Sequence, residues 1–283
     1  MEFVVTTARA ASASVVLLGL LTGCTAMCSS DTPATTARDT QPAPAEGAPA
    51  AWWSPDPDSS WQIQFTGDVD TAVDAEVFDL DGLDTSASTV AEIHDRGGRV
   101  ICYISAGTFE DWRGDAGSFP ADILGNPLPE WPGERWLDIR HLEALEPILA
   151  RRIDTCAQKG FDAVDPDNLD GYSNDSGFPL THDDQIRYNR MVADLAHERG
   201  LGVGLKNDLA QVGELAADFD FAVNEQCIEF DECNLLDPFV TSGKAVLHVE
   251  YDVDPTEFCE SAVGDGFSTI RKHVDLGAWR FAC

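Results

Sequence analysis

Residues 160–168 read Gly-Phe-Asp-Ala-Val-Asp-Pro-Asp-Asn, a short apolar run that follows a glycine and ends in acidic residues. We predict a β-strand over Phe161–Asp165, because short apolar runs bounded by turn-forming residues are typical of buried strands. The residues before this strand carry a helical period that Gly160 ends. The apolar positions on one face of that helix are Leu142, Leu145, Leu149, Ile153 and Cys156. The stretch therefore predicts one helix-to-strand unit of an α/β fold.

The same alternation of short strands and helices runs from Trp61 to the end of the chain. A second helix, whose apolar residues also share one face, is predicted between Thr181 and Gly200. Seven further strands are predicted at Trp61–Thr66, Glu76–Leu80, Arg99–Ser105, Leu201–Lys206, Asp220–Asn224, Ala245–Glu250 and Phe267–Arg271. Eight strands that alternate with helices predict a single-domain (β/α)8 TIM barrel, a fold that commonly takes ~250 residues.

One segment, from Gly107 to Asp138, breaks the alternation. It is rich in Pro, Gly and Trp and is too polar and interrupted to form a barrel helix. We predict that it is a long loop excursion after the third strand, placed over the mouth of the barrel.

The N-terminus has the pattern of an export signal. The apolar run Val15–Leu21 is too short to span a bilayer, and Leu21-Thr22-Gly23-Cys24 resembles the bacterial lipobox, whose cysteine is acylated. We expect residues 1–23 to be a lipoprotein signal peptide and Cys24 to carry lipid, which is the only membrane attachment expected. The alternative is an ordinary secretory signal with a free Cys24. Either way the protein is expected at the extracellular face of the membrane or as a secreted protein.

Residues 24–51 are rich in Thr, Ala, Pro and Asp and have no periodic pattern of apolar residues to bury. We expect a disordered tether here, followed by the barrel domain over residues 52–283.

The chain contains eight cysteines and no CxxC pair, which favours disulfides over zinc in an exported protein. Cys28 falls in the tether. Strand alternation turns Cys102 away from the face of Tyr103 and toward the helix of Cys156, so we expect these two cysteines to pair. The other expected pairs, Cys227 with Cys233 and Cys259 with Cys283, rest on proximity along the sequence.

The formal net charge is −32, from 50 acidic and 18 basic residues. This charge excludes a nucleic-acid partner, because phosphate backbones are bound by basic surfaces. It favours either attraction of a cationic partner or simply a solvated acidic surface.

Polar side chains follow the predicted strands where they end, which is the face that carries the active site of TIM barrels. The acidic residues at these ends are Asp79, Asp81, Asp165, Asp167, Asp208, Glu225, Glu250 and Asp252. The chain has no HExxH motif and no cluster of His and Cys ligands. Convergent carboxylates without such ligands suit cleavage of a glycosidic bond, and we expect neither a metal nor another cofactor.

Two of these acids, Asp165 and Asp167, share one strand face, and we expect the strand ladder to stop at Pro166 between them. Asp167 would then reach the pocket or merely cap the loop. Asp165 would lie beneath it, either as a positioning group or as a structural anchor bonded to backbone N–H groups. Lys206 either pairs with Asp167 or is an ordinary exposed lysine.

Glu225 precedes Cys227, whose expected disulfide would hold this acid in place. The alternative is a surface carboxylate at the end of a strand.

Taken in order, these motifs resemble glycoside hydrolase family 114, the endo-α-1,4-polygalactosaminidase-like barrels. The matching segments are Trp61–Phe65, Phe78–Asp81, Cys102–Gly107, Gly160–Asn168, Leu205–Asn207, Asn224–Cys227 and Glu250–Tyr251. They occur in the expected order between about residues 52 and 275.

The resemblance implies a glycoside hydrolase whose substrate is an α-1,4-linked galactosamine polysaccharide, which is cationic where it is deacetylated. It implies Asp167 and Glu225 as catalytic residues. By similarity to retaining α-glycosidases, Asp167 is the nucleophile and Glu225 the general acid/base. The substrate-binding residues implied are Asp79, Tyr103, Asp165, Asn168, Lys206, Asn207, Glu250 and Tyr251. We expect a monomer.

Three other readings stay open. The protein is a catalytically silent glycan-binding lipoprotein, a glycosidase for a neutral α-galactoside, or a metal-dependent hydrolase with Asp79, Asp81 and Asp165 as ligands. The aromatic residues of the mouth loops either stack on sugar rings or close the core of a long loop. They are Trp112, Trp131, Trp136 and Tyr172.

Overall fold

The structure is a computed structural model that describes residues 52–256, 258–259 and 266–283. The expected signal peptide, the tether and Cys24 lie outside these residues. Within the described ranges, no helix is both long and apolar enough to cross a bilayer.

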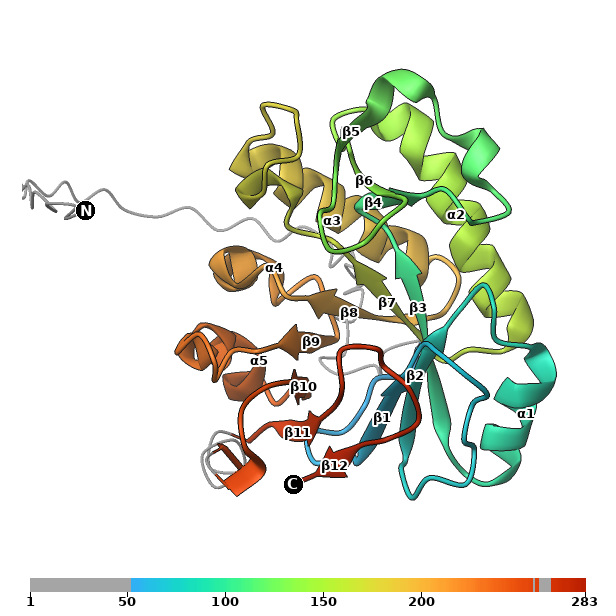
Figure 1. Ribbon diagram of the computed structural model, residues 1–283, viewed down its shortest axis with the longest axis vertical. Coiled ribbons are helices and arrows are strands. Elements are labelled where there is room, and N and C mark those ends of the chain that lie inside the picture. Colours follow the sequence, from blue (N-terminus) through green and yellow to red (C-terminus); the bar gives the residue numbers. More distant parts are fainter. Residues whose placement is uncertain (1–51, 257, 260–265) are drawn as a thin grey trace, which may run out of the picture. The chain divides into compact units, whose positions relative to one another are not determined.

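Eight parallel strands form the main sheet, each within a residue or two of its predicted bounds. They are β1 (Trp61–Gln64), β2 (Val77–Asp81), β3 (Arg99–Ser105), β7 (Ala163–Asp167), β8 (Gly202–Lys206), β9 (Phe221–Glu225), β10 (Val246–Glu250) and β11 (Ser268–Arg271). Each strand pairs with the next of these in the chain, and a short strand, β12 (Phe281–Ala282), pairs antiparallel with β11. In Figure 1 the strands surround a common centre, as the predicted (β/α)8 barrel requires.

The first and last parallel strands are joined by side chains and by the C-terminal segment. Trp61 Nε1 donates to Ser268 O at 2.8 Å. Gln62 lies between two C-terminal groups, because its Nε2 donates to Ala278 O at 2.9 Å and its Oε1 accepts from Lys272 Nζ at 3.0 Å. The chain after β11 therefore closes the barrel against β1.

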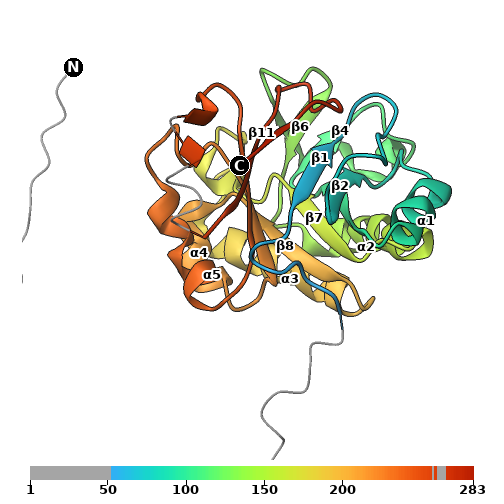
Figure 2. The same cartoon turned by 90° about the horizontal axis from the view of Figure 1, so that it is seen from below.

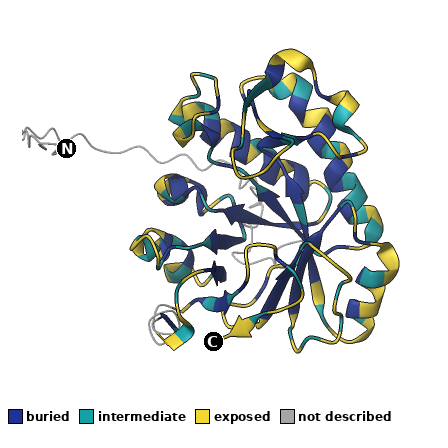
Figure 3. Cartoon of the chain, viewed as in Figure 1, coloured by how far each residue is buried: buried dark blue, intermediate teal, exposed yellow. Residues whose placement is uncertain are grey.

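The described helices lie outside the sheet (Figures 1 and 2). They are α1 (Ala87–Asp95), α2 (Leu142–Lys159), α3 (His182–His197), α4 (Val212–Leu215) and α5 (Asp237–Thr241). The two long helices begin and end as predicted: Thr181 caps α3 in a capping box with Asp184, and α2 ends at Gly160 with φ 91°. Figure 3 shows the buried strands at the centre and exposed positions on the outer faces of the helices.

Strand alternation divides the core into two parts. On β3, Ile101 faces the barrel interior, whereas Val100 and Cys102 face the helices. Cys102 is bonded there to Cys156 of α2, as the alternation predicted. The remaining disulfides are also the expected ones: Cys227 with Cys233 and Cys259 with Cys283.

The predicted excursion after the third strand is a small antiparallel sheet with two short 3₁₀ turns rather than a structureless loop. Its elements are β4 (Thr108–Glu110), η1 (Ala116–Ser118), η2 (Ala121–Ile123), β5 (Leu124–Pro127) and β6 (Glu134–Leu137), in the sheet order β4-β6-β5. Figure 1 shows this sheet beyond the end of β3, on the side of α2. We call residues 107–138 the excursion.

Candidate active site

A cleft of about 810 Å³ lies at the carboxyl ends of the strands, between them and the excursion. The strand ends contribute Tyr103, Asp167, Asn168, Lys206, Asn207, Glu225 and Tyr251, and the excursion contributes Glu110, Trp112, Arg113, Trp131, Glu134 and Trp136. Another depression, lined by α2 and α3, contains none of the predicted site residues. The cleft therefore brings together both predicted catalytic acids and five of the eight predicted binding residues.

The prediction that the ladder stops at Pro166 is wrong on one side of β7. Its pairing with β3 continues through Pro166 to Asp167, whereas its pairing with β8 ends at Val164. Pro166 has no N–H to donate, so a ladder can continue only on the side that does not need this donor. The result is an acid, Asp167, at the tip of a strand that is held on one edge.

Lys206 at the end of β8 joins the two predicted catalytic acids. Its Nζ lies 2.9 Å from Asp167 Oδ1 and 2.9 Å from Glu225 Oε2. These two contacts place the carboxylate oxygens within about 6 Å of each other, a separation that suits two acids acting on one bond. Lys206 is only 3% exposed, which excludes the alternative of an ordinary surface lysine. Burial acts to lower its pKa, but Asp167 and Glu225 raise the pKa well above its usual range.

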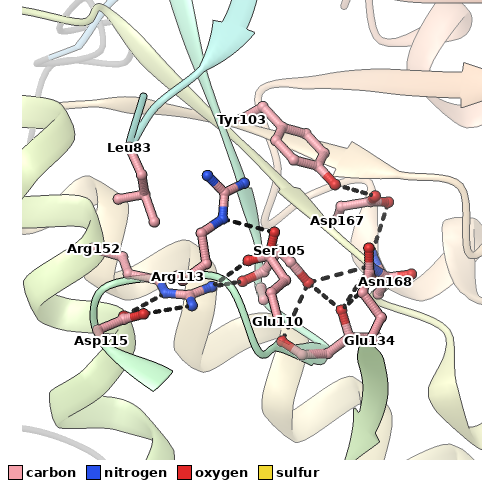
Figure 4. Close-up of polar contacts among 12 residues, drawn as sticks. Leu83, Tyr103, Ser105, Glu110, Arg113, Asp115, Glu134, Arg152, Asp167 and Asn168 are labelled. Atoms are coloured by element: carbon pink, nitrogen blue, oxygen red, sulfur yellow. Dashed lines mark hydrogen bonds and ion pairs between the residues drawn. The ribbon is translucent and has the colours of Figure 1, made fainter. Parts of the chain in front are cut away.

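Asp167 is fixed by three donors. Besides Lys206, the Tyr103 hydroxyl donates to its Oδ2 at 2.8 Å, and the backbone N–H of Asn168 donates to its Oδ1 at 2.8 Å. Figure 4 shows Tyr103 pointing its hydroxyl at this carboxylate. The carboxylate is thus oriented while part of it still faces the cleft.

Glu225 at the end of β9 has its own set of donors. The Tyr251 hydroxyl donates to Oε1, and Asn207 Nδ2 donates to Oε2 at 3.1 Å. Burial acts to raise the pKa of Glu225, but Lys206 and the hydrogen bonds from Tyr251 and Asn207 outweigh it, so the pKa is lowered. Glu225 is therefore ionised in the free protein.

Asn168 connects the strand end to the excursion. Its Nδ2 donates to Ser105 Oγ and Thr108 Oγ1, both at 3.2 Å, and Thr108 Oγ1 donates to Glu134 Oε2 at 2.9 Å (Figure 4). A Cβ on Gly107 would lie 1.7 Å from Asn168 O, so only glycine fits this crossing. Burial raises the pKa of Glu134 to about 7.

Two buried arginines anchor the excursion, and the sequence analysis missed both. Arg113 Nη2 lies 2.6 Å from Asp81 Oδ2, and its Nε lies 2.8 Å from Glu110 Oε1. Arg152 of α2 bridges Glu110 and Asp115 at 3.2 and 2.8 Å (Figure 4). The only sequence signal was the three-residue spacing of Glu110 and Arg113, because the other partners are distant along the chain.

The structure places Asp79, Asp165 and Glu250 beneath the cleft, each with no exposed surface. These predicted binding residues do not line the cleft wall. Glu250 Oε1 accepts from His248 Nε2 and from the backbone N–H of Ile228, both at 2.9 Å, and so supports the loop after Glu225. The prediction that Asp165 is bonded to backbone N–H groups is wrong, because neither of its oxygens has a hydrogen-bond partner among the described residues.

The three acids considered as metal ligands are not free to act together, because Asp81 is paired with Arg113. Among the described residues, the one group of three potential ligands is Cys227, Cys233 and His248. Both of its sulfurs are bonded to each other, so they are not available as thiolate ligands.

Two aromatic side chains of the excursion are open to solvent in the cleft: Trp112 is 52% exposed and Trp131 is 48% exposed. Trp136 also lines the cleft but is largely buried. Tyr172 does not line it and packs edge-on against His182 instead. The stacking reading thus suits the first two residues and the core reading suits Trp136.

The chain is similar to known proteins in both sequence and fold. Residues 42–283 match the glycoside-hydrolase family GH114. The crystal structure of Aspergillus fumigatus Ega3 in complex with galactosamine has a TM-score of 0.77 and 38% sequence identity, and the match covers 82% of this chain and 97% of that chain. The glycoside hydrolase domain of PelA from Pseudomonas aeruginosa shares the fold, with a TM-score of 0.60 and 14% identity over 80% of this chain and 98% of that chain. No curated protein matches the sequence.

Proposed function

We propose, from the premise that this chain belongs to glycoside hydrolase family GH114 and is a glycoside hydrolase, that it cleaves an α-1,4-linked galactosamine polysaccharide with Asp167 and Glu225. The observation that carries the catalytic pair is the bridge through Lys206, which holds both carboxylates within about 6 Å of each other in an open cleft. Retaining glycosidases place their two carboxyl groups about 5–5.5 Å apart, and inverting enzymes about 6.5–9.5 Å. The two oxygens that Lys206 bridges lie no farther apart than about 6 Å, which is below the range of inverting enzymes and supports retention.

In this mechanism Asp167 attacks the anomeric carbon while Glu225 donates a proton to the departing glycosidic oxygen. The carbon–oxygen bond to the leaving sugar breaks as a covalent bond to Asp167 forms. Glu225, now ionised, then takes a proton from water, whose oxygen displaces Asp167 from the sugar. The donors on Asp167 hold it in the orientation for attack, and Tyr251 and Asn207 do the same for Glu225.

The first step needs Glu225 in its protonated form, although its pKa is lowered in the free protein. Only a fraction of the molecules is then correctly protonated at neutral pH, and that fraction grows as the pH falls. We therefore expect activity to favour acidic pH.

The charge of the cleft supports an amino sugar as substrate. Its lining includes ten acidic side chains: Asp81, Asp84, Glu110, Glu130, Glu134, Asp167, Asp170, Glu225, Asp252 and Asp275. Its two cationic side chains, Arg113 and Lys206, are both paired with carboxylates. Such a cleft attracts the ammonium groups of a deacetylated chain. The galactosamine bound to Ega3 agrees with this substrate class.

The decisive experiment incubates the purified domain with a partly deacetylated galactosamine polymer and, in parallel, with its fully N-acetylated form. We expect oligosaccharide products from the first by mass spectrometry, with binding that weakens steeply as salt is added. If the domain cleaved a neutral α-galactoside and not the galactosamine polymer, the proposed substrate would be wrong. If the domain bound the polymer but released no product, the protein would be a glycan-binding protein and not an enzyme.

The cellular location is part of the proposal. Three disulfides support a protein that functions in an oxidising compartment outside the cytoplasm. We propose that Cys24 is acylated and tethers the monomeric enzyme to the membrane surface. Lipid labelling of the cells should mark the full-length protein and should fail to mark a Cys24→Ser variant.

A further inference from the structure

Beneath the catalytic pair lies a second pair of acids that the mechanism does not use. Asp79 on β2 and Asp165 on β7 are both 0% exposed. None of their four carboxylate oxygens has a hydrogen-bond partner among the described residues. Buried carboxylates normally accept hydrogen bonds from the protein, so four unpartnered oxygens require an explanation.

Strand register explains why these two acids meet. Asp165 pairs across the sheet with Tyr103, and Asp79 pairs with Ile101, which lies two residues before Tyr103 on β3. Their side chains point into the barrel, and the two carboxyl groups are within hydrogen-bonding reach of each other. Tyr103 also donates its hydroxyl to Asp167, so the buried pair lies below the floor of the cleft. We call the strand-end residues that line the cleft the floor: Tyr103, Asp167, Asn168, Lys206, Asn207, Glu225 and Tyr251.

The balance of charge excludes two ionised acids at this depth. Asp79, Asp165, Asp167 and Glu225 all act on Lys206, which among the described residues is the cation that contacts the upper two acids. A second unpaired carboxylate in the barrel interior would lack both a donor and a counter-charge, which is unfavourable. A proton on one acid removes the extra charge and supplies the missing donor to the other acid.

We propose that Asp79 and Asp165 share a single proton, with Asp79 as the neutral donor and Asp165 as the ionised acceptor, and that this pair positions Lys206 between the catalytic acids. The sharing of the proton is independent of the proposed function. The positioning of Lys206 by the pair rests on the proposed function.

The direction of the pKa shifts agrees with this assignment. Burial, followed by the charge of Asp165, raises the pKa of Asp79 well above its usual range. Burial also raises the pKa of Asp165, but Lys206 opposes the rise most strongly there, and the pKa is about 7. The acid with the stronger influence from Lys206 is the one that keeps its charge. The other groups that face the pair are Asp167 and Glu225 from the floor, and Tyr103 on β3.

The shared proton links the stability of the protein to pH. Because the folded protein holds a proton that the unfolded chain releases near pH 4, its stabilising effect is complete below that pH. The effect weakens as pH rises above that value and is lost once the pH passes the raised pKa of Asp79 in the folded protein.

The first test needs no variant and no substrate. Aspartate selectively labelled with ¹³C at the carboxyl carbon should give two coupled signals in the wild-type protein, at least one of which stays protonated near neutral pH. Failure of the enzyme assay would leave this result unaffected. Two aspartate signals that both titrate at ordinary values, with no protonated Asp79, would overturn the shared proton.

The second test uses Asp79→Asn and Asp165→Asn. An amide at position 79 donates to Asp165 as the protonated acid does, so we expect Asp79→Asn to change kcat/KM by less than about threefold and to lessen the fall of Tm between pH 4 and 8. Asp165→Asn moves the negative charge away from Lys206, and we expect kcat/KM to fall by at least about tenfold. Asp165 and Glu225 repel each other when both are ionised, so removing the charge of Asp165 should also move the alkaline limb of the pH–rate profile to lower pH.

Asp208→Asn is the matched control, since Asp208 is also buried, accepts a hydrogen bond from Asn189, and has its pKa raised to about 8 by burial. It should remove a different protonated carboxyl signal and leave the pH–rate profile in place. An Asp165→Asn variant with the rate and pH profile of the wild type would overturn the positioning role. It would not affect the shared proton.

Discussion

The floor of the cleft and the excursion above it both carry buried acids, but they treat them differently. On the excursion side, Arg113 pairs with Asp81 and Glu110, so these acids are neutralised by permanent ion pairs. On the floor, Asp167 and Glu225 share one lysine and remain partly exposed. Acids that are each paired with an arginine therefore stabilise the fold of the excursion. Two acids that share one lysine keep a net negative charge, which can act on a substrate.

The two regions also differ in what they show to solvent. The floor presents carboxylates, amides, two tyrosine hydroxyls and the ammonium of Lys206, all held by strands. The excursion presents two half-exposed tryptophans on loops of a small sheet. We therefore expect catalysis at the floor and binding of a long polysaccharide chain at the excursion. Four predictions test this division.

The largest effect should come from Asp167 and Glu225, the two acids proposed as catalytic. Asp167→Asn and Glu225→Gln should each lower kcat by at least about 10³-fold with an unchanged Tm, because each removes a group that acts in the transition state. Asp194→Asn on the exposed side of α3 is the control and should have no effect. Mass spectrometry of Glu225→Gln with an activated aryl glycoside should find sugar attached to Asp167. Attachment at position 225 in any variant would reverse the two roles.

Breaking the excursion's anchor should chiefly affect stability. Arg113→Met leaves Asp81 and Glu110 buried without their cation, and the loss of one partner of a buried ion pair costs about 3–5 kcal/mol. The free energy of unfolding in urea measures this cost. Arg190→Met, which breaks an exposed pair with Asp218, should change it by less than about 1 kcal/mol. Equal effects of the two variants would show that the buried network is not an anchor.

Removing the shared cation of the floor should alter both rate and pH dependence. Lys206→Met should lower kcat/KM by roughly 30-fold, since both acids lose the group that holds them. Lys206 lowers the pKa of Glu225, so the variant should raise that pKa and move the alkaline limb of the pH–rate profile to higher pH. Lys244→Met is the control, because that ammonium lies away from the cleft and donates to the backbone carbonyls of Ala216 and Phe219. A limb that stays in place would contradict this role of Lys206.

The smallest effect should come from the exposed face of the excursion. A Trp112→Ala and Trp131→Ala double variant should lower kcat/KM on the polymer by about tenfold and leave the hydrolysis of a short oligosaccharide unchanged, because only a long chain reaches these rings. Trp279→Ala removes a tryptophan of similar exposure, 46%, that does not line the cleft, and it should have no effect. An equal loss of kcat/KM on short and long substrates would contradict the proposal that the excursion binds the long chain.

Local patterns predicted much of this molecule because they depend on the chain near each residue. The eight strands, the helix that ends at Gly160 and the helix capped by Thr181 follow from periodicity and capping. The bond between Cys102 and Cys156 follows from strand alternation. The acids at the strand ends follow from the same reasoning, since parallel strands of a barrel present their carboxyl ends on one face.

The sequence determined the barrel, its disulfides and the set of acids from which the site is made. Tertiary structure alone decided which acid reaches solvent, which shares a cation and which is buried against another acid. Asp165 and Asp167 differ by two positions on one strand, yet Asp165 lies buried against Asp79 beneath the floor and Asp167 is held by Lys206 and Tyr103. Burial and charge pairing depend on how neighbouring strands are aligned in space, and no local pattern encodes that alignment.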